Sequence, residues 1–340
     1  MLRYLGVDAG GTSTRAAVVS ADGTCSGIGH AGSGNPVSSG IDHAAAQVML
    51  AARRAIRAAG CPPAQIHSAV AAMAGGRVVS DPDWLTEAAA AEGLPFRFRM
   101  ESDLHATFAS GTARDEGYAV VSGTGALAVR VCDGEIDLVS DGIGWLFGDC
   151  GSGFWIGQQV AREALAGLDR RGAPTVLSTA LLEFLGLDTA EHGVLEGRPR
   201  AVQEIIDVLY SWRPVELGRL APLAFAAAGD AVAEDIIARG ADALATTLRA
   251  VRTPEIPGPV VFGGSVLTKQ PRMVALVQER SEPFDEVLFT HDGLVGAASL
   301  ALKRSGISVD EQVYQRLDAT VAQQRARAED RTANAAPPEP

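Results

Sequence analysis

Two short turns rich in glycine and hydroxyl side chains carry the clearest chemical signal in the sequence. The first is Asp8-Ala-Gly-Gly-Thr-Ser-Thr14, and the second is Ser122-Gly-Thr-Gly125. Glycine lets backbone N–H groups approach phosphate oxygens closely, and the hydroxyls add further donors. Because each turn joins two apolar strands, the pair predicts a nucleotide-binding protein that transfers phosphate. The candidate phosphate-binding residues are Gly10, Gly11, Thr12, Ser13, Thr14, Ser122, Gly123, Thr124 and Gly125.

Two carboxylates stand at the ends of expected strands near the first turn. Asp8 ends a strand over residues 2–8, where a carboxylate can orient Mg²⁺ through water. Asp103 follows a strand over 96–101, where a carboxylate can accept a proton from a substrate hydroxyl. An Asp at a strand-to-helix junction is also a common helix N-cap, so this structural role stays open for Asp103. The six histidines have no metal-binding spacing, and of them only His105 lies close to Asp103.

A loop over residues 142–157 combines glycines with tryptophan and phenylalanine. Such a loop brings backbone to a ligand, while its aromatic side chains form apolar walls that suit a sugar ring. A core-packing turn before a helix is the alternative interpretation. Asn35, in a Gly-rich loop, can bind a ligand hydroxyl or only shape its turn. The candidate sugar-binding residues are Asn35, Asp103, Gly142, Ile143, Trp145 and Asp149, the last of which can also assist a metal.

A third glycine turn, Gly263-Gly264-Ser265, follows the apolar run Val260–Phe262. A nucleotide base and ribose can lie against a turn that has no side chains in the way. Taken alone, the same residues also fit an ordinary turn between a strand and a helix.

The elements that position these residues alternate between strands and helices. Apolar runs predict strands over 2–8, 15–20, 67–74, 96–101, 259–262 and 286–289, with a hairpin over 118–132. Helical spacing predicts helices over 42–59, 82–92, 103–110, 154–166, 175–185, 200–209, 216–228, 230–251, 271–280 and 296–305. This alternation indicates an α/β fold with a largely buried sheet.

Composition excludes several classes of protein. The 340 residues are 47% hydrophobic and 21% charged, which suits two domains with a substantial core. A net charge of −12 argues against a nucleic-acid or membrane-surface partner, and no apolar run reaches the roughly 20 residues of a membrane span. The four cysteines have no CxxC spacing, and without a signal peptide they predict a reduced, cytoplasmic location.

In their order along the chain, these motifs resemble those of the actin, sugar-kinase and heat-shock-chaperone ATPase superfamily. Within it, the chain is similar to the BadF/BadG/BcrA/BcrD-type group, which includes N-acetylglucosamine kinase, over about residues 3–305. The resemblance implies a two-lobed, actin-like (ribonuclease H-like) fold with a duplicated hairpin-containing domain and a central cleft. It places the lobes at 1–116 and 117–292, the second with a helical insertion. A helix at 293–312 would pack back on the first lobe, and 313–340 would form a polar tail, a helix that frays into disorder.

The same resemblance implies a role for each motif. Asp103 matches the catalytic base, and Asn35 and Asp149 match sugar-binding positions. Asp8 and the two turns match the Mg–ATP phosphate site, and Gly263 and Gly264 match the adenosine turn. The expected activity is therefore ATP- and Mg²⁺-dependent phosphorylation of a small sugar, at the 6-hydroxyl of N-acetylglucosamine or glucosamine. We also expect a homodimer.

Two departures from the family pattern lie in the expected sugar loop. Cys150 stands where the family usually has Glu, and Ile143 stands where animal N-acetylglucosamine kinases have Trp. Both changes affect the choice of sugar more than the reaction. Two other functions on this fold stay open: a sugar-sensing regulator without catalysis, and an activator ATPase of a dehydratase or reductase. The activator needs cysteines that bind an Fe–S cluster, and the contexts of Cys132 and Cys150 do not resemble them.

Overall fold

The chain folds into two compact units. The computed structural model describes residues 2–75, 83–188 and 193–335. Unit 1 comprises Met1–Asp115, Asp133–Glu135 and Asp292–Pro340, and unit 2 comprises Glu116–Cys132 and Ile136–His291. Residues 336–340 of the expected disordered tail lie outside the described residues.

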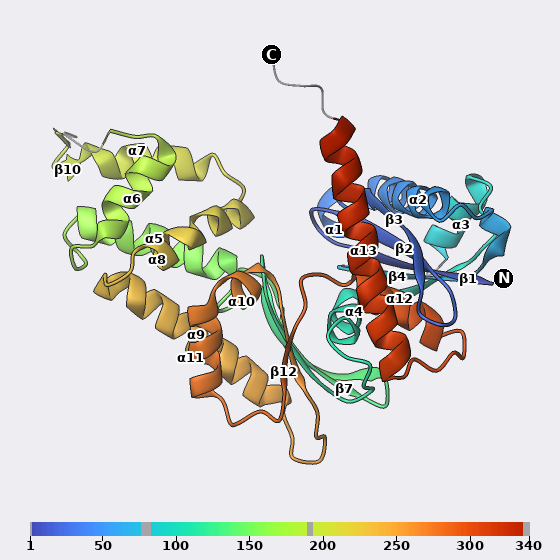
Figure 1. The fold of residues 1–340 in the computed structure, drawn as a ribbon. Helices are drawn as coiled ribbons and strands as arrows, with labels where there is room; N and C mark the ends of the chain where they lie inside the picture. The colour runs from blue at the N-terminus through green and yellow to red at the C-terminus, as the bar shows by residue number, and fades with distance from the viewer. Residues whose placement is uncertain (1, 76–82, 189–192, 336–340) are drawn as a thin grey trace. The chain divides into compact units, whose positions relative to one another are not determined.

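Unit 1 is built on a five-stranded mixed sheet in the order β3-β2-β1-β4-β5 (Figure 1). The first three strands form an antiparallel meander, and β4 and β5 then add parallel to β1. The strands are β1 (Arg3–Ala9), β2 (Thr14–Val19), β3 (Cys25–Ala31), β4 (Ile66–Met73) and β5 (Phe98–Ser102).

Helices cover both faces of this sheet, so alternate residues of each strand enter different cores. Leu5 and Val7 of β1 pack in the core beneath α2 (Ile41–Ala58) and α3 (Trp84–Ala91), on one face of the sheet. Tyr4 packs with α12 (Leu294–Lys303) on the opposite face. The other helices of the unit are α1 (Pro36–Ser39), α4 (Asp103–Ala109) and α13 (Glu311–Ala335), with a 3₁₀ turn η1 (Pro63–Gln65).

Unit 2 repeats the same sheet plan. Its order is β12-β11-β6-β7-β8, in which β7 pairs antiparallel with β6, while β11 and β12 add in parallel. The strands are β6 (Gly117–Ser122), β7 (Ala126–Cys132), β8 (Glu135–Asp141), β11 (Val260–Gly263) and β12 (Val287–Phe289). Because strand order and direction match those of unit 1, the two glycine turns occupy equivalent places, at the first bend of each sheet.

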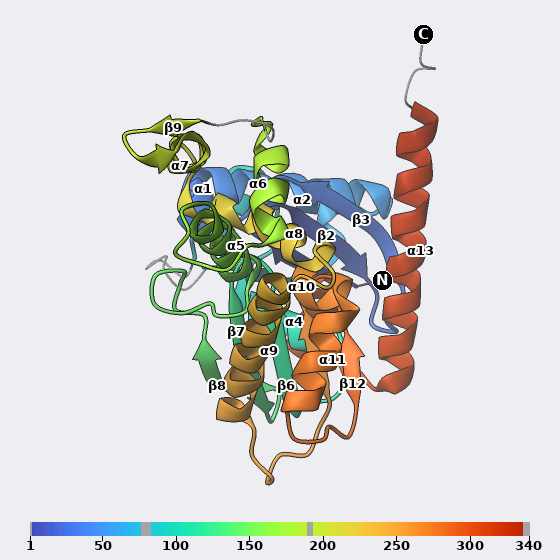
Figure 2. The same cartoon turned by 90° about the vertical axis from the view of Figure 1, so that its left-hand side faces the viewer.

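The helices of unit 2 form one core with its sheet (Figure 2). They are α5 (Gly153–Leu168), α6 (Val176–Leu185), α7 (Arg200–Tyr210), α8 (Ala221–Ala226), α9 (Ala231–Val251), α10 (Ser265–Lys269) and α11 (Pro271–Arg280), with the 3₁₀ segment η3 (Pro214–Leu220). Among the described helices of both units, none is long and apolar enough to cross a membrane.

β3 and β8, the strands that follow the hairpin in each sheet, were not predicted from the sequence. In β3, Gly27 and Gly29 lower strand propensity, yet both are required because α2 packs directly on them. A Cβ at Gly27 would lie 2.3 Å from Ala59 N, and one at Gly29 would lie 2.1 Å from Ala51 O. In β8, most side chains are exposed, so the strand lacks an apolar pattern.

One helical prediction was also inaccurate, because residues 216–228 are not one helix but the end of η3 followed by α8. The short strands β9 (Val194–Leu195) and β10 (Arg198–Pro199) form a hairpin between the helices expected over 175–185 and 200–209. The C-terminal segment that was expected to begin as a helix forms α13, which lies along β3 (Figure 2).

Candidate active site

The first glycine turn of unit 1 is closed by its own backbone. Gly10 N donates to Ser13 O at 3.0 Å, and Gly34 N donates to Gly10 O at 3.0 Å. Thr14 is buried at the start of β2, and its hydroxyl donates to Gly32 O at 2.8 Å. That hydroxyl therefore holds the turn, while Gly11 and Thr12 are exposed and Ser13 is half-buried at its tip. No atom lies within 4 Å of a Cβ placed on Gly11, so a phosphate can approach this backbone.

Asp8 lies one residue before the end of β1, almost fully buried. Its Oδ2 accepts from Gly293 N at 3.2 Å and lies 3.4 Å from Arg15 Nη1. Burial first, and then the charge of Asp292, raise the Asp8 pKa to about 6, although Arg15 and the Gly293 N–H oppose them.

The surroundings of Asp8 fit a hard cation. The charges of Asp292 and Asp103 both raise its pKa, so negative charge is concentrated here. A carboxylate oxygen beside an accessible glycine turn is the donor type that Mg²⁺ prefers, directly or through water. A cation bound by Asp8 would offset the negative charge of this cluster, which otherwise favours a proton on Asp8.

Asp103 lies on the same edge of the sheet as Asp8. Across the parallel strands, Ala9 is level with Met73, and Met73 is level with Ser102. Asp103 directly follows Ser102, so both carboxylates belong to the carboxyl ends of neighbouring strands, where α/β sheets bind ligands.

The N-cap of α4 is Ser102 and not Asp103. Ser102 has extended backbone, and its Oγ accepts from Leu104 N at 3.2 Å. Ser102 therefore fills the N-cap position that was considered for Asp103. Burial raises the pKa of the Asp103 carboxyl, while nearby N–H and O–H donors oppose the shift.

Asn35 serves as a helix cap. Its Oδ1 accepts from Val37 N at 2.8 Å at the start of α1, which is the turn-shaping role considered for it. The same oxygen would lie 3.0 Å from a Cβ on Gly75, just beyond β4, so Asn35 also lies at the carboxyl edge of the sheet. Ligand binding through the amide nitrogen of Asn35 stays a prediction.

In unit 2 the second and third glycine turns lie against each other. Gly263 pairs with Val121 across β11 and β6, and a Cβ on Gly264 would lie 2.4 Å from the Ser122 carbonyl. Ser122 Oγ is buried and donates to Gly151 O at 2.8 Å, so this hydroxyl holds the next loop. Thr124 is exposed at the tip of its turn, and Ser265 is exposed at the start of α10.

Asp149 belongs to unit 2 and braces the second turn. Its Oδ1 accepts from Ala126 N at 3.1 Å, and its own N–H donates to Asp141 Oδ1 at 2.8 Å. Burial raises the Asp149 pKa, and the Asp141 charge adds to this. Asp141 and Asp149 both adopt positive φ, so two carboxylates fix a strained loop.

The expected sugar loop presents apolar side chains to solvent. Ile143 is 64% exposed and Phe147 79% exposed, and the Trp145 ring lies 5.7 Å from that of Phe154. Gly142 has φ of 70° and donates to Ala126 O, which ends β8 in a tight turn. The exposed Phe147 and Leu146 were not singled out from the sequence.

Several site residues come from positions that no local motif marks. Asp292 lies 3.5 Å from Arg15 Nε and 2.7 Å from Arg325 Nη2, which α13 supplies. Arg325 and Asp292 are 33 residues apart, so no spacing rule links them. A cluster around Glu101 and Arg304, described below, was missed for the same reason.

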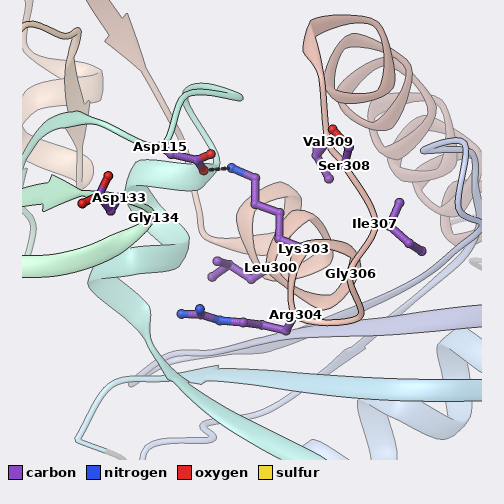
Figure 3. Close-up of a pocket in the computed structure, with 10 residues that line it drawn as sticks. All are labelled: Asp115, Asp133, Gly134, Leu300, Lys303, Arg304, Gly306, Ile307, Ser308 and Val309. Carbon is purple, nitrogen blue, oxygen red and sulfur yellow. Dashed lines mark hydrogen bonds and ion pairs between the residues drawn. The ribbon is translucent and has the colours of Figure 1, made fainter.

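A further cavity lies elsewhere in unit 1. It has a volume of about 390 Å³, and none of the predicted site residues lines it (Figure 3). Two of the basic side chains that line it are paired with carboxylates, as Lys303 Nζ is 2.6 Å from Asp115 Oδ1 and Arg304 binds two glutamates.

Comparisons with known proteins agree with this arrangement of motifs. The sequence model described as the BadF/BadG/BcrA/BcrD ATPase family matches residues 5–301. An N-acetyl-D-glucosamine kinase of Dictyostelium discoideum is 29% identical over 231 residues, 64% of this chain and 69% of that protein. An N-acetylmuramic acid/N-acetylglucosamine kinase of Clostridium acetobutylicum is 36% identical over 90 residues, 26% of this chain and 29% of that protein.

A solved structure is similar over most of the chain. It is described as a candidate N-acetylglucosamine kinase from Chromobacterium violaceum, with a TM-score of 0.67 and 25% sequence identity. The match covers 88% of this chain and 99% of that one. The fold is thus the actin-like α/β fold of sugar kinases, as the motifs predicted.

Proposed function

Because the chain belongs to the BadF/BadG/BcrA/BcrD ATPase family, we propose that it is an ATP-dependent sugar kinase. The main observation behind this proposal is that Asp8, Asp103 and the exposed tip of the first glycine turn lie at the same edge of the sheet of unit 1. Relatives described as N-acetylglucosamine kinases support the same class of reaction. The acceptor that we propose is the 6-hydroxyl of N-acetylglucosamine, with glucosamine as the second choice.

Asp103 is the proposed general base. The sugar hydroxyl oxygen forms a bond to the γ-phosphorus while the bond from that phosphorus to the ADP oxygen breaks, and the hydroxyl proton passes to Asp103. A pKa raised by burial makes this carboxylate a better proton acceptor than an exposed Asp. Bound Mg²⁺ would neutralise charge on the phosphates, and Asp8 is the residue that would hold it.

The choice of sugar depends on residues that the family pattern does not fix. Asn35 offers its amide nitrogen, and Asp149 offers the carboxylate oxygen that is not bonded to Ala126 N. Ile143 is exposed where related animal enzymes carry an aromatic ring. We therefore expect weaker stacking on the sugar and a broader choice among amino sugars.

A coupled ADP-release assay tests the proposal. We expect N-acetylglucosamine or glucosamine to raise ATP turnover, with glucose, N-acetylmannosamine and muropeptide-type sugars as alternatives. Asp103→Asn should lower kcat by about 10²–10⁴-fold, because general-base catalysis is typically worth that much. It should leave the KM for ATP within about threefold, since Asp103 does not touch the turn backbone.

Two outcomes would contradict the proposal. Near-normal phosphorylation by Asp103→Asn would remove the base assignment, although not the kinase activity. Turnover that no sugar stimulates, in anaerobically purified protein with the colour of an Fe–S cluster, would favour the activator ATPase instead.

A further inference from the structure

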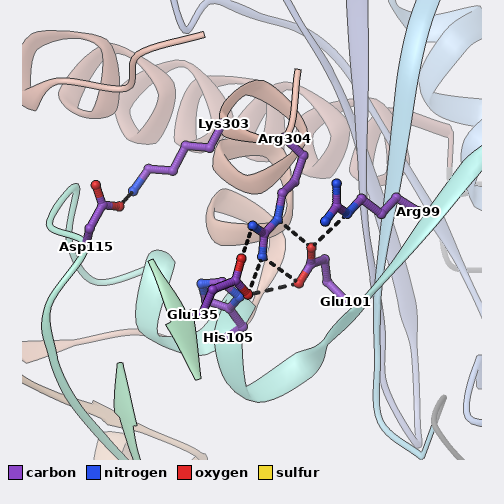
Figure 4. Close-up of polar contacts among 7 residues, drawn as sticks. All are labelled: Arg99, Glu101, His105, Asp115, Glu135, Lys303 and Arg304. Atoms are coloured by element: carbon purple, nitrogen blue, oxygen red, sulfur yellow. Dashed lines mark hydrogen bonds and ion pairs between the residues drawn. The ribbon is translucent and has the colours of Figure 1, made fainter. Parts of the chain in front are cut away.

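Arg304 joins three segments of unit 1 that are far apart in the sequence. It caps the C-terminus of α12, and its guanidinium lies between Glu101 and Glu135 (Figure 4). Nε donates to Glu101 Oε1 at 2.6 Å, and Nη2 lies 3.3 Å from Glu101 Oε2. Nη2 also donates to Glu135 Oε2 at 2.8 Å, and Nη1 donates to the other oxygen of Glu135. The guanidinium is therefore bidentate toward two carboxylates.

Glu101 is the inner partner, and it lies two residues before Asp103. Only 10% of its side chain is exposed, whereas 61% of the Glu135 side chain is exposed. His105 of α4 also approaches Glu101, with Nδ1 3.4 Å from Oε2, and Arg99 Nε lies 3.5 Å from Oε1. Burial alone would raise the Glu101 pKa, but His105 and Arg304 outweigh it and hold the pKa at about 2.

These bonds fix the junction that presents Asp103. Glu101 is the penultimate residue of β5 on one side of Asp103, and His105 belongs to the first turn of α4 on the other. A tether at both sides leaves the intervening residues little freedom to shift. The tether from Arg304 is the one anchored outside the junction, because it comes from α12.

We propose that Arg304 is a positioning residue for the catalytic base, acting through Glu101 on the Glu101–Asp103 junction. This inference rests on the proposed function, because it assumes that Asp103 accepts the sugar proton. The hydrogen bonds described for Arg304 go to Glu101 and Glu135, so its proposed effect on Asp103 is indirect. A displacement of a reacting group by about 1 Å can cost about 10²-fold in rate, so a loose junction should lower kcat.

The test compares four variants with the wild-type chain. Arg304→Gln removes both tethers, and Arg304→Lys keeps the charge with a single donor group. Glu135→Gln weakens only the exposed outer arm. Arg53→Gln is the matched control, since Arg53 also donates twice to one glutamate, Glu92, on an exposed part of unit 1.

Two measurements are made on each variant. Steady-state kinetics use the sugar that the ADP-release assay identifies. They should show kcat reduced about 10- to 100-fold in Arg304→Gln, with the KM for ATP within about threefold. Arg304→Lys should recover part of that loss, and kcat of Glu135→Gln and of Arg53→Gln should stay within about threefold of wild type. Hydrogen exchange should show faster exchange in Arg304→Gln for the peptide over 98–109, and unchanged exchange for the peptide over 3–19.

Charge repair separates positioning from damage to the fold. Arg304→Gln leaves the Glu101 carboxylate buried with less compensation, so Glu101→Gln in the same chain should restore part of kcat and of the exchange protection. If Arg304→Gln does not fold, Arg304→Lys and this double variant carry the test. Unchanged kcat and unchanged exchange over 98–109 would overturn the proposal, as would an equal loss in Arg53→Gln or Glu135→Gln.

The exchange readout also distinguishes two kinds of failure. If wild type phosphorylates no sugar but Arg304→Gln still loosens 98–109, the proposed function fails while the tether stands. If wild type is a sugar kinase and Arg304→Gln leaves both kcat and exchange unchanged, the positioning role fails while the proposed function stands.

Discussion

Folding makes the ionised form of the Asp8 carboxylate energetically unfavourable. Its pKa is raised from an ordinary value of 3.8 to about 6, first by burial and then by Asp292. Between these pH values the folded chain binds a proton that the unfolded chain has released. Stability from this group is therefore greatest below about pH 4 and is lost as pH rises through about 6.

Asp8→Asn should stabilise the metal-free protein while abolishing most of its activity. The gain at pH 7 should reach at most about 3 kcal/mol, from a shift of about two pKa units, and it should shrink below about pH 5. Urea unfolding with a metal chelator measures it. Asp22→Asn is the opposite control: hydrogen bonds from Ser20 and Thr24 lower the Asp22 pKa to about 2, so this variant should be less stable at neutral pH. An Asp8→Asn chain less stable than wild type at pH 7 would contradict the burial argument.

At the scale of elements, α13 completes unit 1. β3 is the edge strand of its sheet, and α13 supplies hydrogen-bond partners to that edge. Cys25 N donates to Thr320 Oγ1 at 2.9 Å, and Gln324 Nε2 donates to Cys25 O at 3.4 Å. Its Arg325 binds Asp292, so the same helix that covers the edge also reaches the neighbours of Asp8.

Arg325→Gln should destabilise the protein by about 1–2 kcal/mol, because a hydrogen bond to a largely buried charge is lost. Only 11% of the Asp292 side chain is exposed, so a largely buried carboxylate would keep fewer partners, among them Arg15 and the Leu294 N–H. Arg316→Gln on the same helix is the control, since its partner Asp22 is 53% exposed and such surface pairs contribute little. Chemical denaturation of both variants makes the comparison, and equal losses would show that Arg325 has no special role.

At the scale of the whole molecule, the predicted nucleotide-binding residues are divided between the units. Gly10–Thr14 belong to unit 1, whereas Ser122–Gly125 and Gly263–Ser265 belong to unit 2. Nucleotide binding by residues of these turns should stabilise the folded chain. We expect Mg–ATP at about 100 times its Kd to add about 2.7 kcal/mol, in wild type and in Asp103→Asn alike. Scanning calorimetry in which Mg–ATP leaves both melting temperatures unchanged would contradict nucleotide binding by these turns.

The sequence predicted those features whose signal is local. The duplicated turns predicted the family and the fold class, and both are confirmed. β3 was not predicted because its glycines are required by the close packing of α2, although glycine lowers strand propensity. β8 was not predicted because most of its side chains are exposed and form no apolar pattern. Arg304 and Glu101 are 203 residues apart, so only folding brings them together. The roles of Asp8, Asn35, Asp103 and Asp149 stay predictions.

The cover that α13 gives to β3 has a consequence for synthesis on the ribosome. Cys25 is made 295 residues before Thr320, its hydrogen-bond partner. At typical elongation rates this delay lasts roughly 15 to 60 s, during which the strand edge has no cover. An uncovered edge pairs readily with other chains. We therefore expect nascent or C-terminally truncated chains to depend on chaperones more than the finished protein does.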